Sequence, residues 1–146
     1  MIAYLDSSVL ARAYLADEDG HDHALELLND PEIAAVTGTW TRIEVSGALV
    51  RAARAGRVEA DDLLALLDAD LSADGPVTVL SARQDQIEDM ALGLVRGHAL
   101  RAMDAWHLAV ASLTIPGLAE TGEQIAFASR DEAQAASAVL LGFTRV

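Results

Sequence analysis

The sequence predicts an α/β fold built on a mostly parallel sheet. Short apolar runs alternate with segments of helical periodicity along all 146 residues. This alternation is typical of parallel strands joined by helices that cover both faces of a sheet. The length suits one domain, and no repeat, low-complexity tract or linker divides the chain. We therefore expect a single domain over residues 1–146.

The expected strands are apolar runs of about four residues, which are too short to form a helix. Each run is bounded by polar, glycine or proline residues that favour turns. These strands comprise residues 2–5, 33–36, 77–80 and 125–128, and residues 142–146 are expected to add an edge strand.

The expected helices are segments in which apolar residues recur at helical spacing. They comprise residues 9–15, 24–28, 40–55, 58–71, 87–95, 101–113 and 132–141. Ser7 or Ser8 is expected to cap the first helix and Thr39 or Thr41 the third, because hydroxyl oxygens accept hydrogen bonds from free backbone N–H groups. Gly97 is expected to end the fifth helix.

Composition limits the chemistry that this chain can use. The formal net charge is −13, all ten basic residues are Arg, and the chain contains neither Lys nor Cys. Without cysteine, disulfides and thiolate metal sites are excluded. The lack of Lys disfavours phosphoacceptor receiver domains and haloacid-dehalogenase-type phosphatases, which usually place a Lys beside an Asp. The acidity argues against a basic nucleic-acid interface, although bound cations would offset it.

The N-terminus gives no sign of export. Met1 leads directly into an expected strand, and no apolar run approaches the roughly 18 residues that a membrane span requires. We therefore expect a cytoplasmic protein with no membrane contact.

Four acidic residues stand where an element would deliver a carboxylate to one point. Asp6 and Asp131 each close an apolar run, at the strand end where sites form in parallel sheets. Glu44 and Asp104 each interrupt an otherwise apolar helical face. A carboxylate in such a place is costly unless it is paired or binds a metal. The set therefore predicts a site for hard cations with oxygen ligands, Mg²⁺ or Mn²⁺.

Such a site predicts hydrolysis of phosphodiester bonds. Two metal ions about 3.5–4 Å apart can activate water and stabilise the leaving oxygen. No arrangement of Ser, His and Asp in the sequence suggests a nucleophilic triad, and we expect His107 to have a structural role. Asp6 and Asp131 could instead be ordinary helix caps.

The ordered motifs resemble those of PIN domains over essentially the whole chain. The resemblance rests on residues 5–10 around Asp6, Glu44-Val45 before Ala48-Leu49, residues 104–109 beginning at Asp104, and Ser129-Arg130-Asp131 before an Ala-rich helix. It implies a PIN-like α/β/α sandwich whose four carboxylates bind the metal and catalyse the reaction. In the same interpretation, Ser7, Ser8 and Ser129 orient these carboxylates by hydrogen bonding.

The small size is similar to that of VapC-type toxins of bacterial toxin–antitoxin pairs. That likeness implies a homodimeric endoribonuclease that cleaves RNA and is inhibited by a small VapB-like antitoxin. The antitoxin is expected to insert an Arg or Lys among the carboxylates. Its remaining anchoring surface is expected on Val9, Leu10, Tyr14 and the leucine stripe of residues 63–71.

The sequence departs from the family pattern in one interval. Asp104 and Asp131 are 27 residues apart, which is long for the family, and residues 115–124 are expected to form an inserted loop. Two alternatives stay open: a PIN nuclease that acts in RNA processing or on flapped DNA, and a catalytically inactive PIN-like binding module. Arg51, Arg54 and Arg57 could face RNA or pair with nearby acids.

Overall fold

Five parallel strands form the centre of the computed structural model, which describes residues 1–146. Their order across the sheet is β3-β2-β1-β4-β5, with β1 in the middle. The strands are β1 (Ile2–Leu5), β2 (Ala34–Gly38), β3 (Thr78–Leu80), β4 (Ile125–Ala128) and β5 (Thr144–Arg145). The predicted α/β class is confirmed, and every strand pair is parallel.

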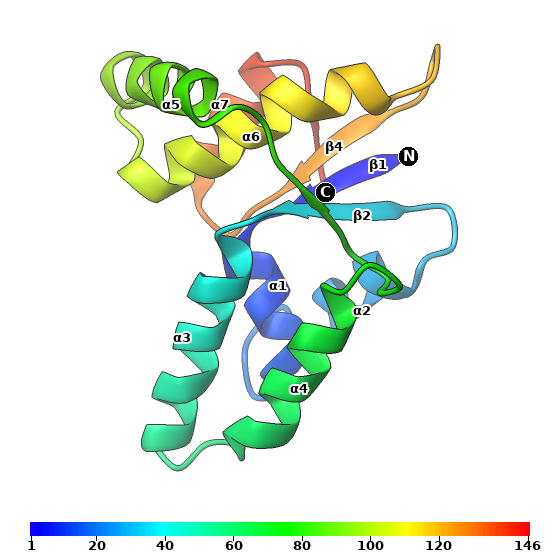
Figure 1. Ribbon diagram of the computed structural model, residues 1–146, viewed down its shortest axis with the longest axis vertical. Coiled ribbons are helices and arrows are strands. Elements are labelled where there is room, and N and C mark those ends of the chain that lie inside the picture. The colour runs from blue at the N-terminus through cyan, green and yellow to red at the C-terminus, as the bar shows by residue number, and fades with distance from the viewer.

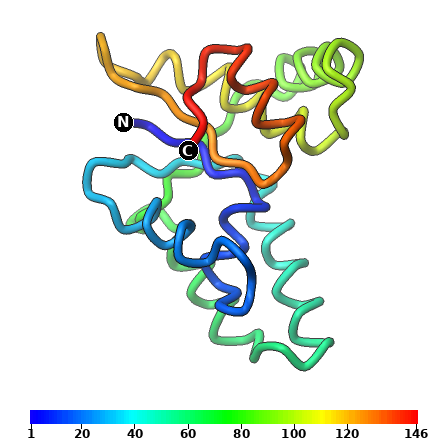
Figure 2. Tube along the Cα trace, turned by 180° about the vertical axis from the view of Figure 1, so that it is seen from behind, coloured from blue at the N-terminus to red at the C-terminus, as the bar shows by residue number.

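Seven helices cover the two faces of this sheet. They are α1 (Ser7–Tyr14), α2 (His21–Asn29), α3 (Thr41–Arg54), α4 (Ala60–Asp70), α5 (Gln84–His98), α6 (Ala102–Leu118) and α7 (Glu132–Leu140). Helices α1 to α4 lie on one side of the sheet and α5 to α7 on the other (Figure 1). Seen from behind, both chain ends lie beside the sheet (Figure 2).

Alternation along β1 divides the core into two clusters. Ile2 and Tyr4 pack with Phe127 and the residues of α5 and α6. Ala3 and Leu5 belong to the second cluster, which contains the buried residues of α1 to α4. Successive side chains of a strand point to opposite faces, so one apolar run supports both layers. This double burial explains why the strands are continuous apolar runs.

The register of the sheet decides where the site lies. Leu5 pairs with Ala128, so β1 and β4 end together, and Asp6 follows one strand while Ser129 follows the other. The connections from these two strands lead to helices on opposite faces, which makes the β1/β4 boundary a topological switch point. Ligands bind at such points in open parallel sheets.

Helix boundaries differ from the sequence-based expectation at three caps. Asp6, rather than Ser7 or Ser8, caps α1 through its side chain. Neither threonine caps α3, because Thr41 is buried and shares a hydrogen bond with Thr37. Helix α5 continues past Gly97 and ends where Ala99 adopts a left-handed conformation with φ 55°.

The first four residues of the expected inserted loop, 115–118, are helical. Helix α6 continues through Pro116 to Leu118, so only residues 119–124 connect it to β4. Pro116 removes one backbone donor, but it lies in the last turn of the helix. Ile115 is fully buried in the cluster that contains Phe127, and this packing holds the last turn in place. None of the helices is both long and apolar enough to cross a membrane.

Candidate active site

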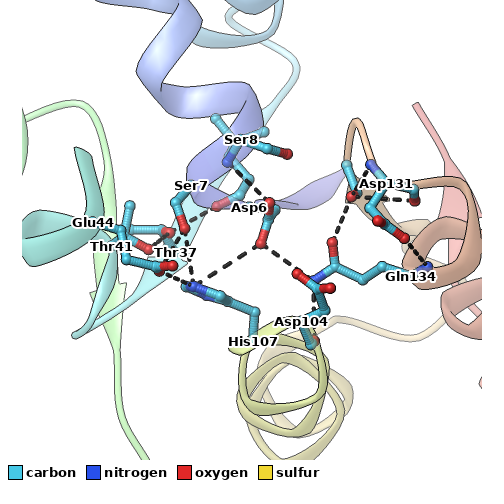
Figure 3. A network of polar contacts seen from close by, with 12 residues as sticks. Asp6, Ser7, Ser8, Thr37, Thr41, Glu44, Asp104, His107, Asp131 and Gln134 are labelled. Carbon is cyan, nitrogen blue, oxygen red and sulfur yellow. Dashed lines mark hydrogen bonds and ion pairs between the residues drawn. The ribbon is translucent and has the colours of Figure 1, made fainter. Parts of the chain in front are cut away.

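Asp6 lies at the centre of the polar network beyond the carboxyl ends of β1 and β4 (Figure 3). Its side chain is almost completely buried. Oδ2 accepts a hydrogen bond from the backbone N–H of Ser8 at 2.9 Å, and Oδ1 accepts one from Nε2 of Gln134 at 3.2 Å. The carboxylate is thus both the cap of α1 and a fixed acceptor that faces α7.

Glu44 lies on the side of the network whose supporting residues, His107 and Ser7, are buried, although its own side chain is 30% exposed. We call this the buried side. Ser7 donates a hydrogen bond from Oγ to Oε2 of Glu44 at 2.6 Å, and Nε2 of His107 lies 2.5 Å from the same oxygen. Nδ1 of His107 lies 2.8 Å from the hydroxyl of Tyr4. A neutral imidazole with its proton on Nε2 satisfies both contacts. Tyr4 can be the donor because burial, with the charges of Asp6 and Glu44, raises its pKa.

The Glu44 carboxylate is held ionised by these contacts. Burial alone would raise its pKa, but the hydrogen bonds from His107 and Ser7 outweigh burial and lower the pKa below its ordinary value. His107 is only 1% exposed, and both of its ring nitrogens have partners. The prediction of a structural His107 thus agrees with its contacts, whereas its bond to Glu44 was not predicted.

Asp104 and Asp131 share one guanidinium on the other side of the network, which we call the open side because that partner, Arg101, is exposed. Nε of Arg101 donates to Oδ2 of Asp104 at 2.7 Å, and Nη2 donates to Oδ2 of Asp131 at 2.9 Å. Burial, helped by the negative charges of Asp6 and Asp131, raises the pKa of Asp104, and Arg101 only partly opposes that rise. Asp131 also caps α7, because its Oδ1 accepts from the N–H of Gln134.

Gln134 joins the two sides, and sequence reasoning missed it. Its side chain is fully buried; Nε2 donates to Oδ1 of Asp6 and to the backbone carbonyl of Asp104 at 3.0 Å, and Oε1 accepts from Oγ of Ser129. A single amide thereby links three of the motifs. The available signal was a long uncharged polar side chain within an Ala-rich apolar helix.

The three serines of the motifs contact the carboxylates or their supports. Ser7 bonds to Glu44 directly. Ser8 contributes its backbone N–H to Asp6, while its Oγ accepts from the N–H of Arg130. Ser129 accepts from the N–H of Asp131 at 2.9 Å and donates to Gln134. These contacts can orient carboxylates, as the resemblance implied.

A cavity of about 570 Å³ opens beside this network. Three of the four predicted carboxylates line it, namely those of Asp6, Glu44 and Asp104, whereas Asp131 does not line it and is paired with Arg101. Helices α1, α3 and α6 supply the walls. The lining also includes the arginines Arg12, Arg51 and Arg101.

The carboxylates do not form the compact metal cluster that the sequence suggested. No three acidic or histidine side chains are grouped so that they could hold a metal ion. The geometry gives the reason: His107 and Ser7 hold Glu44, Ser8 and Gln134 hold Asp6, and Arg101 bridges Asp104 and Asp131. The donor chemistry still suits a hard cation, because all four groups offer carboxylate oxygens.

Comparison with models of known families shows to which family this chain belongs. The model of the PIN domain family matches residues 3–140. The chain belongs to the PIN domain family. PIN domains are generally metal-dependent nucleases, and the all-parallel sheet with helices on both faces is consistent with that fold. A comparison with curated proteins finds no match.

Proposed function

We propose that this PIN domain is a metal-dependent endoribonuclease, similar to VapC-type toxins, that cleaves RNA with Mg²⁺ or Mn²⁺. The observation that supports this proposal most directly is the cavity that Asp6, Glu44 and Asp104 line at the switch point of a PIN domain. Three carboxylates from three distant segments line one cavity, and carboxylate oxygens are the ligands that a hard cation prefers.

In this proposal, Asp6, Glu44, Asp104 and Asp131 hold the metal. When bound there, such an ion would supply the chemistry of water activation and of charge stabilisation on the leaving oxygen. The chain itself orients the ligands. Gln134 and the N–H of Ser8 hold Asp6, and a carboxylate oriented by such partners binds metal better than a mobile one.

His107 is unsuited to be the general base of this reaction. A general base must reach the proton that it removes, but His107 is buried and contacts Tyr4, Ser7 and Glu44. Its contribution is to fix the position of Glu44, so the residues of this site leave water activation to the ion.

A small VapB-like antitoxin, a homodimeric state and a cytoplasmic location form part of the same proposal. Arg101 supports the antitoxin interpretation, because its guanidinium already bridges two of the carboxylates. A cationic side chain from a partner could make equivalent contacts. The expected anchoring surface needs correction: Val9, Leu10 and Tyr14 are buried in the core, and of the leucines within residues 63–71 only Leu66 is strongly exposed, at 51%.

The absence of a compact cluster favours one alternative, a PIN-like binding module that has lost catalysis. A metal titration separates the two functions. The nuclease requires that purified protein cleaves RNA with Mg²⁺ or Mn²⁺, that EDTA abolishes cleavage, and that Asp6→Asn and Asp104→Asn remove it while circular dichroism shows an intact fold. A matched control is Glu132→Gln, which removes only an exposed pair with Arg145.

Two outcomes would contradict the proposed nuclease. The first is the absence of cleavage with either metal, and the second is full activity in either Asp variant. RNA processing outside toxin–antitoxin systems would gain support if the protein cleaves RNA but recovers no small basic-tailed protein when purified from its own cells.

A further inference from the structure

Most arginines of this acidic protein form ion pairs with carboxylates of the same chain. Seven of the ten form ion pairs within the chain: Arg12, Arg42, Arg57, Arg83, Arg101, Arg130 and Arg145. Arg51, Arg54 and Arg96 form none. A phosphate would have to displace a carboxylate from any of the seven, whereas the other three have a free guanidinium. The unpaired arginines are therefore the first candidates for contacts with a polyanion.

Of these three arginines, only Arg51 lines the cavity that contains Asp6, Glu44 and Asp104. Glu44, Ala48 and Arg51 stand at positions i, i+4 and i+7 of α3, and all three line the same wall. Along the helix axis, Arg51 begins roughly 10 Å from Glu44. The small side chain of Ala48 leaves the space between them open.

The guanidinium of Arg51 also folds back toward the carboxylates. Nη1 lies 3.1 Å from the place that a Cβ on residue 47 would occupy, and Gly47 has no such atom. Glycine inside a helix costs about 0.5–1 kcal/mol relative to alanine. Gly47 leaves room for the guanidinium to lie over the turn that joins Arg51 to Glu44.

We propose that Arg51 is a substrate-binding residue that contacts a backbone phosphate of single-stranded RNA, next to the phosphate that is cleaved. This inference rests on the proposed ribonuclease function. The other arginines of the cavity are held elsewhere: Arg12 donates to the carbonyls of Ser8 and Asp19, and Arg101 bridges Asp104 and Asp131. Arg51 alone offers positive charge to the strand without breaking an existing pair.

The charge of Arg51 and its position in the cavity together support its role in binding a phosphate. The carboxylates repel a polyanion unless cations offset them, so a strand that approaches the cavity needs a fixed positive charge nearby. Arg51 supplies that charge from a backbone position two helical turns from Glu44, with its guanidinium over the turn between them. Because it stands two helical turns from Glu44, it contacts a neighbouring phosphate and leaves the reacting atoms to the carboxylate end.

The test compares Arg51→Gln with Arg54→Gln, a matched control on the same helix whose arginine is also unpaired but lies outside the cavity. The substrate is a pool of single-stranded RNA oligonucleotides of random sequence, cleaved with Mn²⁺ at several salt concentrations. For Arg51→Gln we expect KM to rise about tenfold with kcat within about twofold. The slope of log KM against log salt should fall by about 0.7, the value for one phosphate on a single strand.

Arg51→Lys completes the design. Lysine keeps the point charge that a phosphate needs, so this variant should recover most of the affinity. Equal KM values and salt slopes for Arg51→Gln, Arg54→Gln and wild type, with active wild type, would overturn this inference and leave the nuclease in place. Failure of the wild type to cleave the pool would overturn both. A fall in kcat alone would also count against a binding role.

Discussion

The two sides of the site hold their carboxylates with different kinds of partner. Glu44, on the buried side, is held by His107 and Ser7, whose side chains are fixed in the core. Asp104, on the open side, is held by Arg101, whose side chain is 75% exposed. The pKa of Glu44 is lowered and that of Asp104 is raised. The buried side is a preorganised support, and the open side carries a counter-ion that another cation can replace.

This difference indicates which partner of the carboxylates a ligand can displace more easily. Replacing His107 or Ser7 would require the core to open, because their partners lie on β1, α1 and α3. Replacing Arg101 requires only that one exposed side chain changes its rotamer. Exposed ion pairs contribute roughly 0–1 kcal/mol, so the energy that opposes such a change is small. Metal or a cationic partner should therefore enter from the Asp104 side.

The largest expected effect is on stability. His107→Ala removes a buried ring and leaves Tyr4 and Glu44 without a partner, so we expect the free energy of unfolding to fall by about 3 kcal/mol. Arg101→Ala should leave it nearly unchanged, because the ion pairs of Arg101 are formed by an exposed side chain that water screens. Urea denaturation of both variants measures the contrast, and similar losses would mean that the two sides are equally rigid.

Gln134 tests whether the two sides act as one unit. Gln134→Ala leaves Asp6, Ser129 and the carbonyl of Asp104 each one hydrogen bond short, so we expect a loss of about 2 kcal/mol in urea denaturation. Gln134→Glu is the sharper variant, because it keeps the size but places a negative charge against Asp6 at the position of the present 3.2 Å contact. It should destabilise the protein more at neutral pH than at pH 4, and a pH-independent effect would contradict this arrangement.

Removing the guanidinium should strengthen metal binding. We expect Arg101→Gln to lower the dissociation constant of Mn²⁺ about threefold to tenfold, since the ion no longer competes with Arg101 for Asp104 and Asp131. Isothermal titration measures the affinity, and the shift of the melting temperature with added Mn²⁺ checks it independently. Arg145→Gln serves as the control because it breaks an exposed pair with Glu132 instead. Weaker Mn²⁺ binding in Arg101→Gln would show that Arg101 supports the site.

The smallest effect concerns Asp104 in metal-free protein. A raised folded-state pKa means that ionisation opposes folding, so Asp104→Asn should stabilise the protein by at most about 1 kcal/mol above that pKa, because water screens a partly exposed charge. The gain should vanish as pH falls below the unfolded value of about 3.9. For Glu44, whose pKa is lowered, Glu44→Gln should cost stability at neutral pH and less in acid. Melting temperatures of both variants and of wild type, recorded in EDTA between pH 3 and 8, test both signs. If the two differences from wild type change with pH in the same direction, the opposite pKa shifts of Glu44 and Asp104 are contradicted.

Local sequence determined the elements and the sheet edge that carries the site. Apolar runs such as residues 125–128 could only be buried strands, and the periodicity of α3 and α7 required amphipathic or buried helices. Strand-end positions placed Asp6 and Asp131 at one edge because parallel strands share a direction. These are short-range rules, which is why residue order alone was sufficient for them.

Only the tertiary structure determined which side chains of the site contact one another. His107 meets Tyr4 across 103 residues, and Gln134 meets Asp6 across 128. These contacts depend on strand register, helix packing and rotamers, so neither periodicity nor spacing could reveal them. The same holds for Arg101, whose bridge to Asp131 kept the open side from forming a compact cluster. It also holds for Pro116, where burial of Ile115 overrode a local helix breaker. Long-range packing acts after local preferences are set, and it fixed the charge state and accessibility of each carboxylate.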